Sequence, residues 1–276
     1  MTAIRKVYEM DEITAVIRYK DSASTLPEVL DSLKRQTRPV DCIVAVDTGS
    51  RDDSTRILTE AGAKIIKWEQ PYHHSRVTNF GISHCDTPYV LCLSSHTAMN
   101  EPDIVANLLV SMSDPRVAAS SICWDDDSFY TNKIDHHEIL QKGLKLGSIY
   151  TNSLGLLRKT LWEQHAFDES INGVEDYEWA IHQLQAGYKI HRLQAKISYQ
   201  RKGHNRIMRG TARVFCIAHR YQLKVTWLGY KATAQALIKH LPGKLKGQDE
   251  AVERFDYHAR RLMGSLFWRF IDLNIN

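Results

Sequence analysis

A regular alternation of short β-branched runs with amphipathic stretches over the first 120 residues most constrains how this chain can fold. The runs predict buried strands, and the stretches between them place leucine and valine on one helical face. The strands are predicted at 13–18, 42–47, 63–68 and 88–93, and the helices at 25–36, 52–61 and 75–85. Strands and helices in this order are typical of an α/β fold with a mostly parallel sheet and flanking helices.

The rest of the chain is mixed at first and then helical. A further strand is predicted at 117–123, a helix at 176–186, strands at 188–193 and 195–199, and long helices at 211–224 and 249–273. We therefore expect two domains: an α/β domain over residues 1–205 and a basic amphipathic helical extension over residues 206–276.

Composition excludes several classes of protein. A chain of 276 residues, 43% hydrophobic and 25% charged, is long and apolar enough to bury a core and is not disordered. It has no apolar run near the ~20 residues that cross a bilayer, and residues 1–6 lack the apolar region of a signal peptide. Its five cysteines are scattered without a C-x-x-C pair, which is typical of reduced thiols. We expect a cytoplasmic protein.

Positive charge is concentrated at one end. Residues 201–276 carry fifteen Lys and Arg against five Asp and Glu, so an anionic membrane surface, a phosphate group or nucleic acid is a candidate partner. A solvated helical face explains the same charge. Trp227, Trp268 and Tyr221 could stack on bases, but the helical spacing of the apolar residues favours core packing, so no nucleic-acid partner is expected.

Polar side chains follow three of the predicted strands, at 18–21, 47–53 and 94–97. Parallel sheets bind ligands at the carboxyl ends of their strands, so a site is predicted there. Segment 47–54 (DTGSRDDS) is informative because Asp47 could accept a hydrogen bond from a base or a ribose. Taken alone, it predicts no more than a capped strand–helix turn.

The motifs gain meaning in combination. Segment 18–21 (RYKD), the leucines of 26–33, Gln36-Thr37 and segment 47–54 together resemble the opening of glycosyltransferase family 2, whose enzymes have the Rossmann-like GT-A fold. Asp21 stands where the family usually has asparagine. Segment 79–93, beginning at Asn79, is similar to the family's next motif. The resemblance covers about residues 11–205 and implies that Arg18, Asp21, Asp47, Arg76 and Asn79 bind a nucleotide-sugar donor.

The sequence departs from the family at one place. The family normally has D-x-D after the fourth strand, where two carboxylates bind a divalent metal on the pyrophosphate; here the residues are Ser94, Ser95 and His96. Losing two hard ligands weakens a Mg²⁺ site, although His96, with His204, could bind Mn²⁺. Alternatively, Arg76 or Arg18 neutralises the pyrophosphate without a metal. Ser94, Ser95 and His96 are expected beside the donor in either case.

Segment 173–179 (GVEDYEW) resembles the family's G-x-E-D motif, in which the aspartate is the general base of inverting members. This implies that Asp176 deprotonates the acceptor and that Glu175 positions the acceptor or the base. The same residues would also suit the first turn of a helix, where acidic side chains are favoured.

The resemblance implies an inverting glycosyltransferase that moves a sugar from a nucleotide-diphosphate donor to a hydroxyl of a glycan or lipid-linked saccharide, as in polysaccharide biosynthesis. The basic extension 206–276 would then rest on the inner face of the membrane. The alternative is a non-catalytic GT-A-like protein that binds glycans or nucleotides. The motifs of hydrolases, P-loop nucleotidases and dinucleotide-dependent dehydrogenases are lacking.

Overall fold

The computed structural model describes residues 11–123, 129–145, 149–200 and 207–224, together with the single residues 238, 242 and 259. His204, Trp227 and Trp268 lie outside the described residues. So do the helix predicted at 249–273, apart from Ala259, and most of the predicted extension beyond residue 224. Contacts divide the chain into two compact units, of which the first comprises residues 1–135, 148–169 and 175–201 and the second comprises residues 136–147, 170–174 and 202–276.

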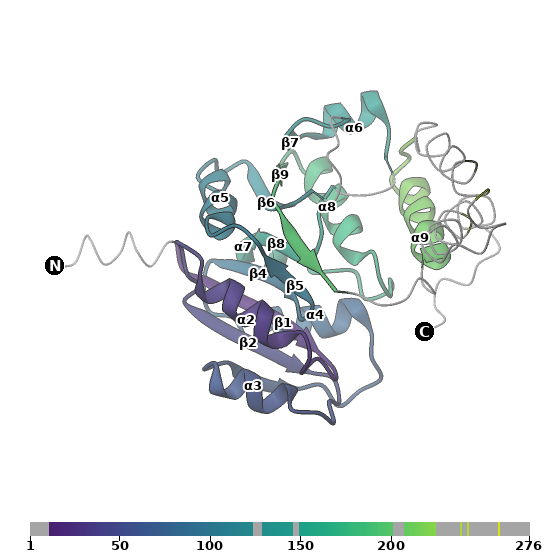
Figure 1. The fold of residues 1–276 in the computed structure, drawn as a ribbon. Coiled ribbons are helices and arrows are strands. Elements are labelled where there is room, and N and C mark those ends of the chain that lie inside the picture. The colour runs from purple at the N-terminus through teal and green to yellow at the C-terminus, as the bar shows by residue number, and fades with distance from the viewer. Residues whose placement is uncertain are drawn as a thin grey trace. The chain divides into compact units, whose positions relative to one another are not determined.

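The first unit is built on an eight-stranded sheet within the described residues (Figure 1), with strand order β3-β2-β1-β4-β8-β6-β9-β7. The strands are β1 (Ile13–Tyr19), β2 (Cys42–Asp47), β3 (Lys64–Lys67), β4 (Tyr89–Ser94), β6 (Val117–Ile122), β7 (Lys133–Ile134), β8 (Leu154–Arg158) and β9 (Lys189–Leu193). Six of them run in one direction, and β8 and β7 run against it. The predicted mostly parallel α/β sheet is confirmed. A separate pair joins β5 (Thr97–Met99) to β10 (Ile197–Tyr199).

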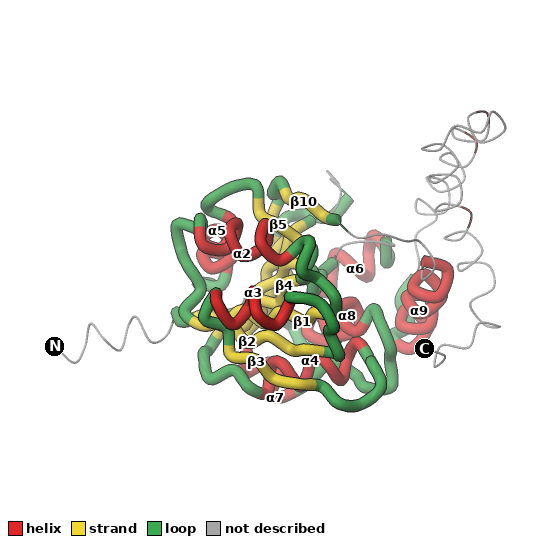
Figure 2. Tube along the Cα trace, turned by 60° about the horizontal axis from the view of Figure 1, so that its bottom comes forward, coloured by secondary structure: helices red, strands yellow, loops and turns green. Residues whose placement is uncertain are grey.

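Helices cover both faces of this sheet (Figure 2). In the first unit they are α2 (Leu26–Lys34), α3 (Ser54–Glu60), α4 (His74–Ser83), α5 (Ile104–Ser111), α7 (Lys159–Gln164) and α8 (Glu175–Gln185). Apolar residues of α2, α3 and α5 form one buried core with alternate residues of β1, such as Ile13, Ala15 and Ile17. Helix α4 lies against the other face, where a Cβ added to Gly81 would come within 2.6 Å of Val16 Cγ1. The glycine therefore lets α4 approach the sheet closely.

Strand register brings the carboxyl ends of the first strands together. Tyr19 of β1 lies opposite Asp47 of β2, and Arg18 lies opposite Ser94 of β4. Because side chains alternate along a strand, Tyr19 points to the α2–α3 face with the core residues, and Arg18 points to the α4 face. This alternation decides which helix each polar residue meets.

The second unit contains two described helices, α6 (His136–Lys142) and α9 (Ile207–Arg220). Helix α9 corresponds to the helix predicted at 211–224, and Gln222 just after it has a φ of 54°. No helix among the described residues is both long and apolar enough to span a membrane. Three of the cysteines, Cys85, Cys92 and Cys123, are buried.

Candidate active site

Asp47 ends β2 and shapes the turn that follows it. Its Oδ1 accepts hydrogen bonds from the N–H of Gly49 at 3.1 Å and of Ser50 at 2.8 Å. Its Oδ2 accepts one from the Thr55 hydroxyl at 3.4 Å. Gly49 has a φ of 97°, a left-handed conformation that glycine adopts without strain. Asp47 is 8% exposed. Its carboxylate organises the turn and lies at the carboxyl end of β2.

The loops after β1 and β2 are tied to each other through acidic side chains. Asp21 has a φ of 47°, and its Oδ1 accepts a hydrogen bond from the N–H of Arg51 at 2.7 Å. Asp52 Oδ2 accepts one from the N–H of Ala23 at 2.9 Å. These bonds hold Asp21 and the 47–54 turn as one surface at the carboxyl ends of the strands.

Ser94 ends β4, and Ser95 and His96 form the turn between β4 and β5. The Ser94 hydroxyl lies 3.0 Å from His96 Nε2, and the Ser95 and Ser22 hydroxyls are 3.0 Å apart. The His96 ring meets the Tyr199 ring edge to face, with centroids 5.0 Å apart. The three predicted residues therefore lie at the same end of the sheet as Asp47.

The residues at this turn do not fit a divalent cation held by carboxylates. Where the D-x-D motif would stand, this chain has one imidazole and two hydroxyls. Mg²⁺ instead requires hard oxygen ligands in octahedral geometry. Among the residues that the structure describes, which do not include His204, no three His, Cys, Asp or Glu side chains cluster in a way that could hold a metal ion. No chemical step is therefore assigned to a metal here.

Arg18 reaches the opposite face of the sheet from Tyr19. Its Nη1–H donates to the Thr78 hydroxyl at 2.7 Å and lies 3.8 Å from Glu175 Oε1. The Thr78 hydroxyl in turn donates to the carbonyl of His74 at 2.7 Å. The structure thus brings Arg18 to the acidic pair at the start of α8.

Glu175 and Asp176 open helix α8, where the N-terminal end of the helix favours negative charge. The backbone N–H of Asn152 donates to Asp176 Oδ2 at 3.0 Å, and the Asn152 side-chain amide donates to Glu175 Oε1 at 3.2 Å. Glu175 is 3% exposed, whereas Asp176 is partly exposed. Asp176 is therefore the member of the pair that a substrate can reach.

The turn before α8 is strained. Val174 has a φ of 64°, after Gly173 with a φ of 93°. A left-handed conformation is rare for a β-branched residue, and such strain gathers at functional sites.

Burial raises the pKa of Asp176 to about 7, and the neighbouring charge of Glu175 adds to the increase. The N–H groups of Asn152 and Tyr177 and the charge of Arg18 act in the opposite direction. A carboxyl group that titrates near neutral pH can accept a proton from a substrate and later release it. Burial also raises the pKa of the Cys92 thiol to about 12.

We expect Asp176→Asn to stabilise the fold at pH 8, by on the order of 1–3 kcal/mol. The pKa of Asp176 rises on folding from 3.8 to about 7. Between pH 3.8 and about pH 7, the carboxyl group of Asp176 ionises in the unfolded chain but stays protonated in the folded protein. Its ionisation therefore favours unfolding, and an amide, which does not ionise, avoids this loss of stability. Urea unfolding at pH 8 and pH 4.5 measures the difference. The gain should fall to about a quarter of its pH 8 value at pH 4.5, which lies close to the unfolded pKa; an equal gain at both pH values would contradict this origin.

Asn79 is fully bonded within the protein. Its Nδ2 donates to the carbonyl of Phe167 at 2.8 Å and to Glu169 Oε1 at 3.1 Å. Its Oδ1 accepts from Trp162 Nε1 at 3.0 Å and from the N–H of Phe167 at 3.1 Å. The amide therefore has no hydrogen-bonding position left for a donor molecule while these contacts persist. Nearby, Arg76 is half exposed and lies 3.6 Å from Glu169.

Sequence reasoning missed two residues at this site. Thr78 lies next to Asn79 in the sequence, but its hydroxyl faces Arg18. Asn152 precedes β8, a strand that the sequence pattern did not predict. No local motif marks Asn152, because its role depends on β8 lying between β4 and β6.

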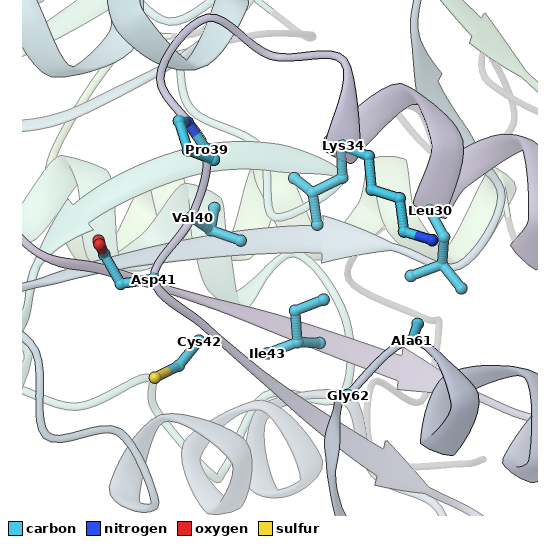
Figure 3. Close-up of a pocket in the computed structure, with 10 residues that line it drawn as sticks. Leu30, Lys34, Pro39, Val40, Asp41, Cys42, Ile43, Ala61 and Gly62 are labelled. Atoms are coloured by element: carbon cyan, nitrogen blue, oxygen red, sulfur yellow. The ribbon is translucent and has the colours of Figure 1, made fainter.

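A cavity of about 230 Å³ lies elsewhere in the first unit (Figure 3). It is lined by residues of α2, including Lys34, by the start of β2 and the segment that leads into it, including Cys42 and Asp41, and by Ala61 and Gly62 just after α3. Asp47 ends the same strand. The cavity is therefore separate from the cluster at the carboxyl ends of the strands.

Comparison with known proteins identifies relatives of this chain. The family model "Glycosyl transferase family 2" matches residues 14–167, more than half of the chain. The O-antigen chain rhamnosyltransferase RfbN of Salmonella typhimurium is 24% identical over 203 residues, which are 65% of this chain and 63% of that protein. The chain thus spans less than two thirds of this curated relative.

Solved structures show the same fold. A mannosyltransferase of Pyrobaculum calidifontis, PcManGT, in complex with GDP-Man and Mn²⁺, matches with a TM-score of 0.68 at 15% identity, over 94% of this chain and 87% of that chain. Residues 1–349 of S. aureus TarS, in complex with UDP, match with a TM-score of 0.54 at 13% identity, over 94% of this chain and 91% of that chain.

Proposed function

Because the chain belongs to glycosyl transferase family 2, we propose that it is an inverting glycosyltransferase that uses a nucleotide-diphosphate sugar. The observation that carries the proposal is the Glu175–Asp176 pair, which presents one partly exposed carboxyl group with a pKa of about 7. This pair lies beyond the region matched by the family model, so it supports the proposal independently of that match.

In the proposed reaction, Asp176 accepts the proton of the acceptor hydroxyl as its oxygen attacks the anomeric carbon. The bond between that carbon and the diphosphate oxygen breaks, and the nucleotide diphosphate leaves with the electron pair. Attack from the face opposite the leaving group inverts the configuration. A positioned base of this kind contributes ~10²- to 10⁴-fold to the rate.

The donor is proposed to lie over the carboxyl ends of β1, β2 and β4. Asp47 and Asp21, joined by the 47–54 turn, would face the nucleoside, and Ser94, Ser95 and His96 would face the ribose and diphosphate. Arg76 is half exposed and is the proposed cation for the diphosphate.

The acceptor is proposed to be a hydroxyl of a glycan or a lipid-linked saccharide. Support comes from the relative RfbN, which is named for transfer to the O-antigen chain. The excess of Lys and Arg in residues 201–276 supports binding to an anionic membrane at the cytoplasmic face.

A panel of nucleotide sugars tests the proposal. A donor present at ~100 times its Kd adds ~2.7 kcal/mol to the stability of the protein, which corresponds to a rise in Tm of about 5–10 °C. The same donor should release nucleotide diphosphate when an acceptor saccharide is added. Each assay is run with and without Mn²⁺. Stabilisation by a donor without turnover of any donor–acceptor pair would favour the alternative, a non-catalytic binding protein, which the missing acidic motif also allows.

A further inference from the structure

We propose that Arg18 is a positioning residue for the acidic pair of α8, holding Glu175 and through it Asp176, and that it is not a ligand of the donor. This inference rests on the proposed function, because it concerns the base of that reaction. It differs from the donor-binding role that the sequence motif implies for Arg18. The evidence for it is the face of the sheet to which the Arg18 side chain points.

The path of β1 places Arg18 on the acidic side. The core residues Ile13, Ala15, Ile17 and Tyr19 share one face of the strand with α2 and α3. Arg18 lies between the last two of them, so its side chain leaves the opposite face. It meets α4 and the start of α8 there, and not the turn after β2 that Asp47 organises.

Two contacts fix the guanidinium in this place. The Thr78 hydroxyl has a single proton, which it donates to the carbonyl of His74, and it therefore receives the Arg18 bond on its lone pair. Arg18 Nη1 also lies 3.8 Å from Glu175 Oε1. One end of the guanidinium is thus anchored on α4 while its charge faces α8.

A second brace comes from Asn152. Its side-chain amide donates to the same Glu175 oxygen that faces Arg18, and its backbone N–H donates to Asp176 Oδ2. Arg18, Glu175, Asn152 and Asp176 therefore form one continuous network across β1, α8 and the segment before β8. A shift of Glu175 would disturb Asn152, whose backbone N–H orients Asp176.

Burial commits Arg18 to this network. The side chains of Arg18 and Glu175 are 17% and 4% exposed. Removing one partner of a buried pair leaves the other charge uncompensated, which is strongly unfavourable. If Arg18 turned toward a diphosphate, Glu175 would remain buried without its cation. Arg76 is half exposed and has no such constraint.

The electrostatic environment agrees with this geometry. Among the described residues, the ionisable groups that interact electrostatically with Asp176 include Glu175 beside it, Arg18 from β1, Cys92 from β4 and Tyr150 from the segment before β8. Tyr72 faces Arg18 from the segment before α4. Arg18 is the cation of this set, and it lowers the pKa of Asp176 against the effects of burial and of Glu175.

Arg18→Met and Arg18→Lys test the proposal, with Lys64→Met as the matched control because Lys64 is exposed and begins β3, away from the carboxyl ends of the strands. We expect Arg18→Met to lower kcat at pH 7 by about 10-fold or more and to move the acidic limb of the pH–rate profile upward by about one pH unit. The donor KM should stay within about twofold, because the contacts of Arg18 are internal. Arg18→Lys should restore part of the loss, and Lys64→Met should change neither quantity.

A tenfold rise in donor KM with an unmoved acidic limb would overturn the proposal and make Arg18 a donor ligand. A readout without turnover separates this failure from that of the proposed function. The ¹³C-carboxyl signal of Asp176, assigned with Asp176→Asn, should titrate about one pH unit higher in Arg18→Met than in the wild type. An unchanged midpoint would overturn the role of Arg18, whereas absence of turnover in the wild type would overturn only the function.

Thr78→Val provides a second variant should Arg18→Met fail to fold. It keeps the charge of Arg18 and removes the hydroxyl that anchors it. We expect the Asp176 titration to move in the same direction by a smaller amount. A midpoint equal to that of the wild type would contradict the anchoring role of Thr78 and, with it, the proposal.

Discussion

Replacing Asp176 by asparagine is expected to lower kcat by about 10²- to 10⁴-fold while donor binding is unchanged. The amide has the shape of the carboxylate, and its oxygen can still accept the hydrogen bond from the N–H of Asn152. It cannot accept a proton from the acceptor hydroxyl, so only the chemical step should suffer. Release of nucleotide diphosphate measures kcat, and calorimetry with the donor measures Kd.

The wild-type pH profile belongs to the same prediction. With a pKa of about 7, Asp176 gains its base form as the pH rises through neutrality, so kcat should increase with pH over that range. The residual activity of Asp176→Asn should lack this limb. Glu163→Gln is the control because it exchanges an exposed carboxylate of α7 for an amide and should leave kcat unchanged. Full activity in Asp176→Asn would remove Asp176 from its proposed role.

Local patterns were sufficient to predict the part of the fold that consists of consecutive strand–helix units. Strands β1, β2, β3 and β4 are neighbours in the sheet and near neighbours in the sequence, and each strand is bounded by turn residues. Strand β8 was not predicted, because it inserts antiparallel between β4 and β6, far from both in the sequence. Such a pairing is set by tertiary packing, which a short apolar run does not reveal.

The predicted site likewise contains residues whose positions follow from local sequence patterns and residues whose contacts do not. Asp47 and His96 lie at the ends of their strands, as expected from residues that follow buried runs. The face to which Arg18 points depends on the alternation of side chains along β1, and its partner Glu175 is more than 150 residues away. The partners of Asn79 at 162–169 are similarly remote. A motif thus identifies residues that matter without saying what each one contacts.

Asn79→Ala is expected to destabilise the fold by about 3–5 kcal/mol. The change removes four hydrogen bonds at once and leaves the buried indole N–H of Trp162 and both backbone groups of Phe167 without this partner. Each unsatisfied buried group costs about 1–3 kcal/mol, and the small cavity adds to the loss. Urea unfolding monitored by tryptophan fluorescence measures the free energy of unfolding.

Asn107→Ala is the matched control because Asn107 is exposed on α5 and bonds to Asp103 alone at 3.1 Å, so it should cost less than about 0.5 kcal/mol. Asn79→Asp separates the two roles of Asn79. Its charge would face the carboxylate of Glu169 and the carbonyl of Phe167 without any proton to donate, so it should destabilise at least as much as alanine. If both Asn79 variants kept wild-type stability but bound the donor more weakly, Asn79 would be a donor ligand, as the motif resemblance implies, and the internal bonds would be incidental to folding.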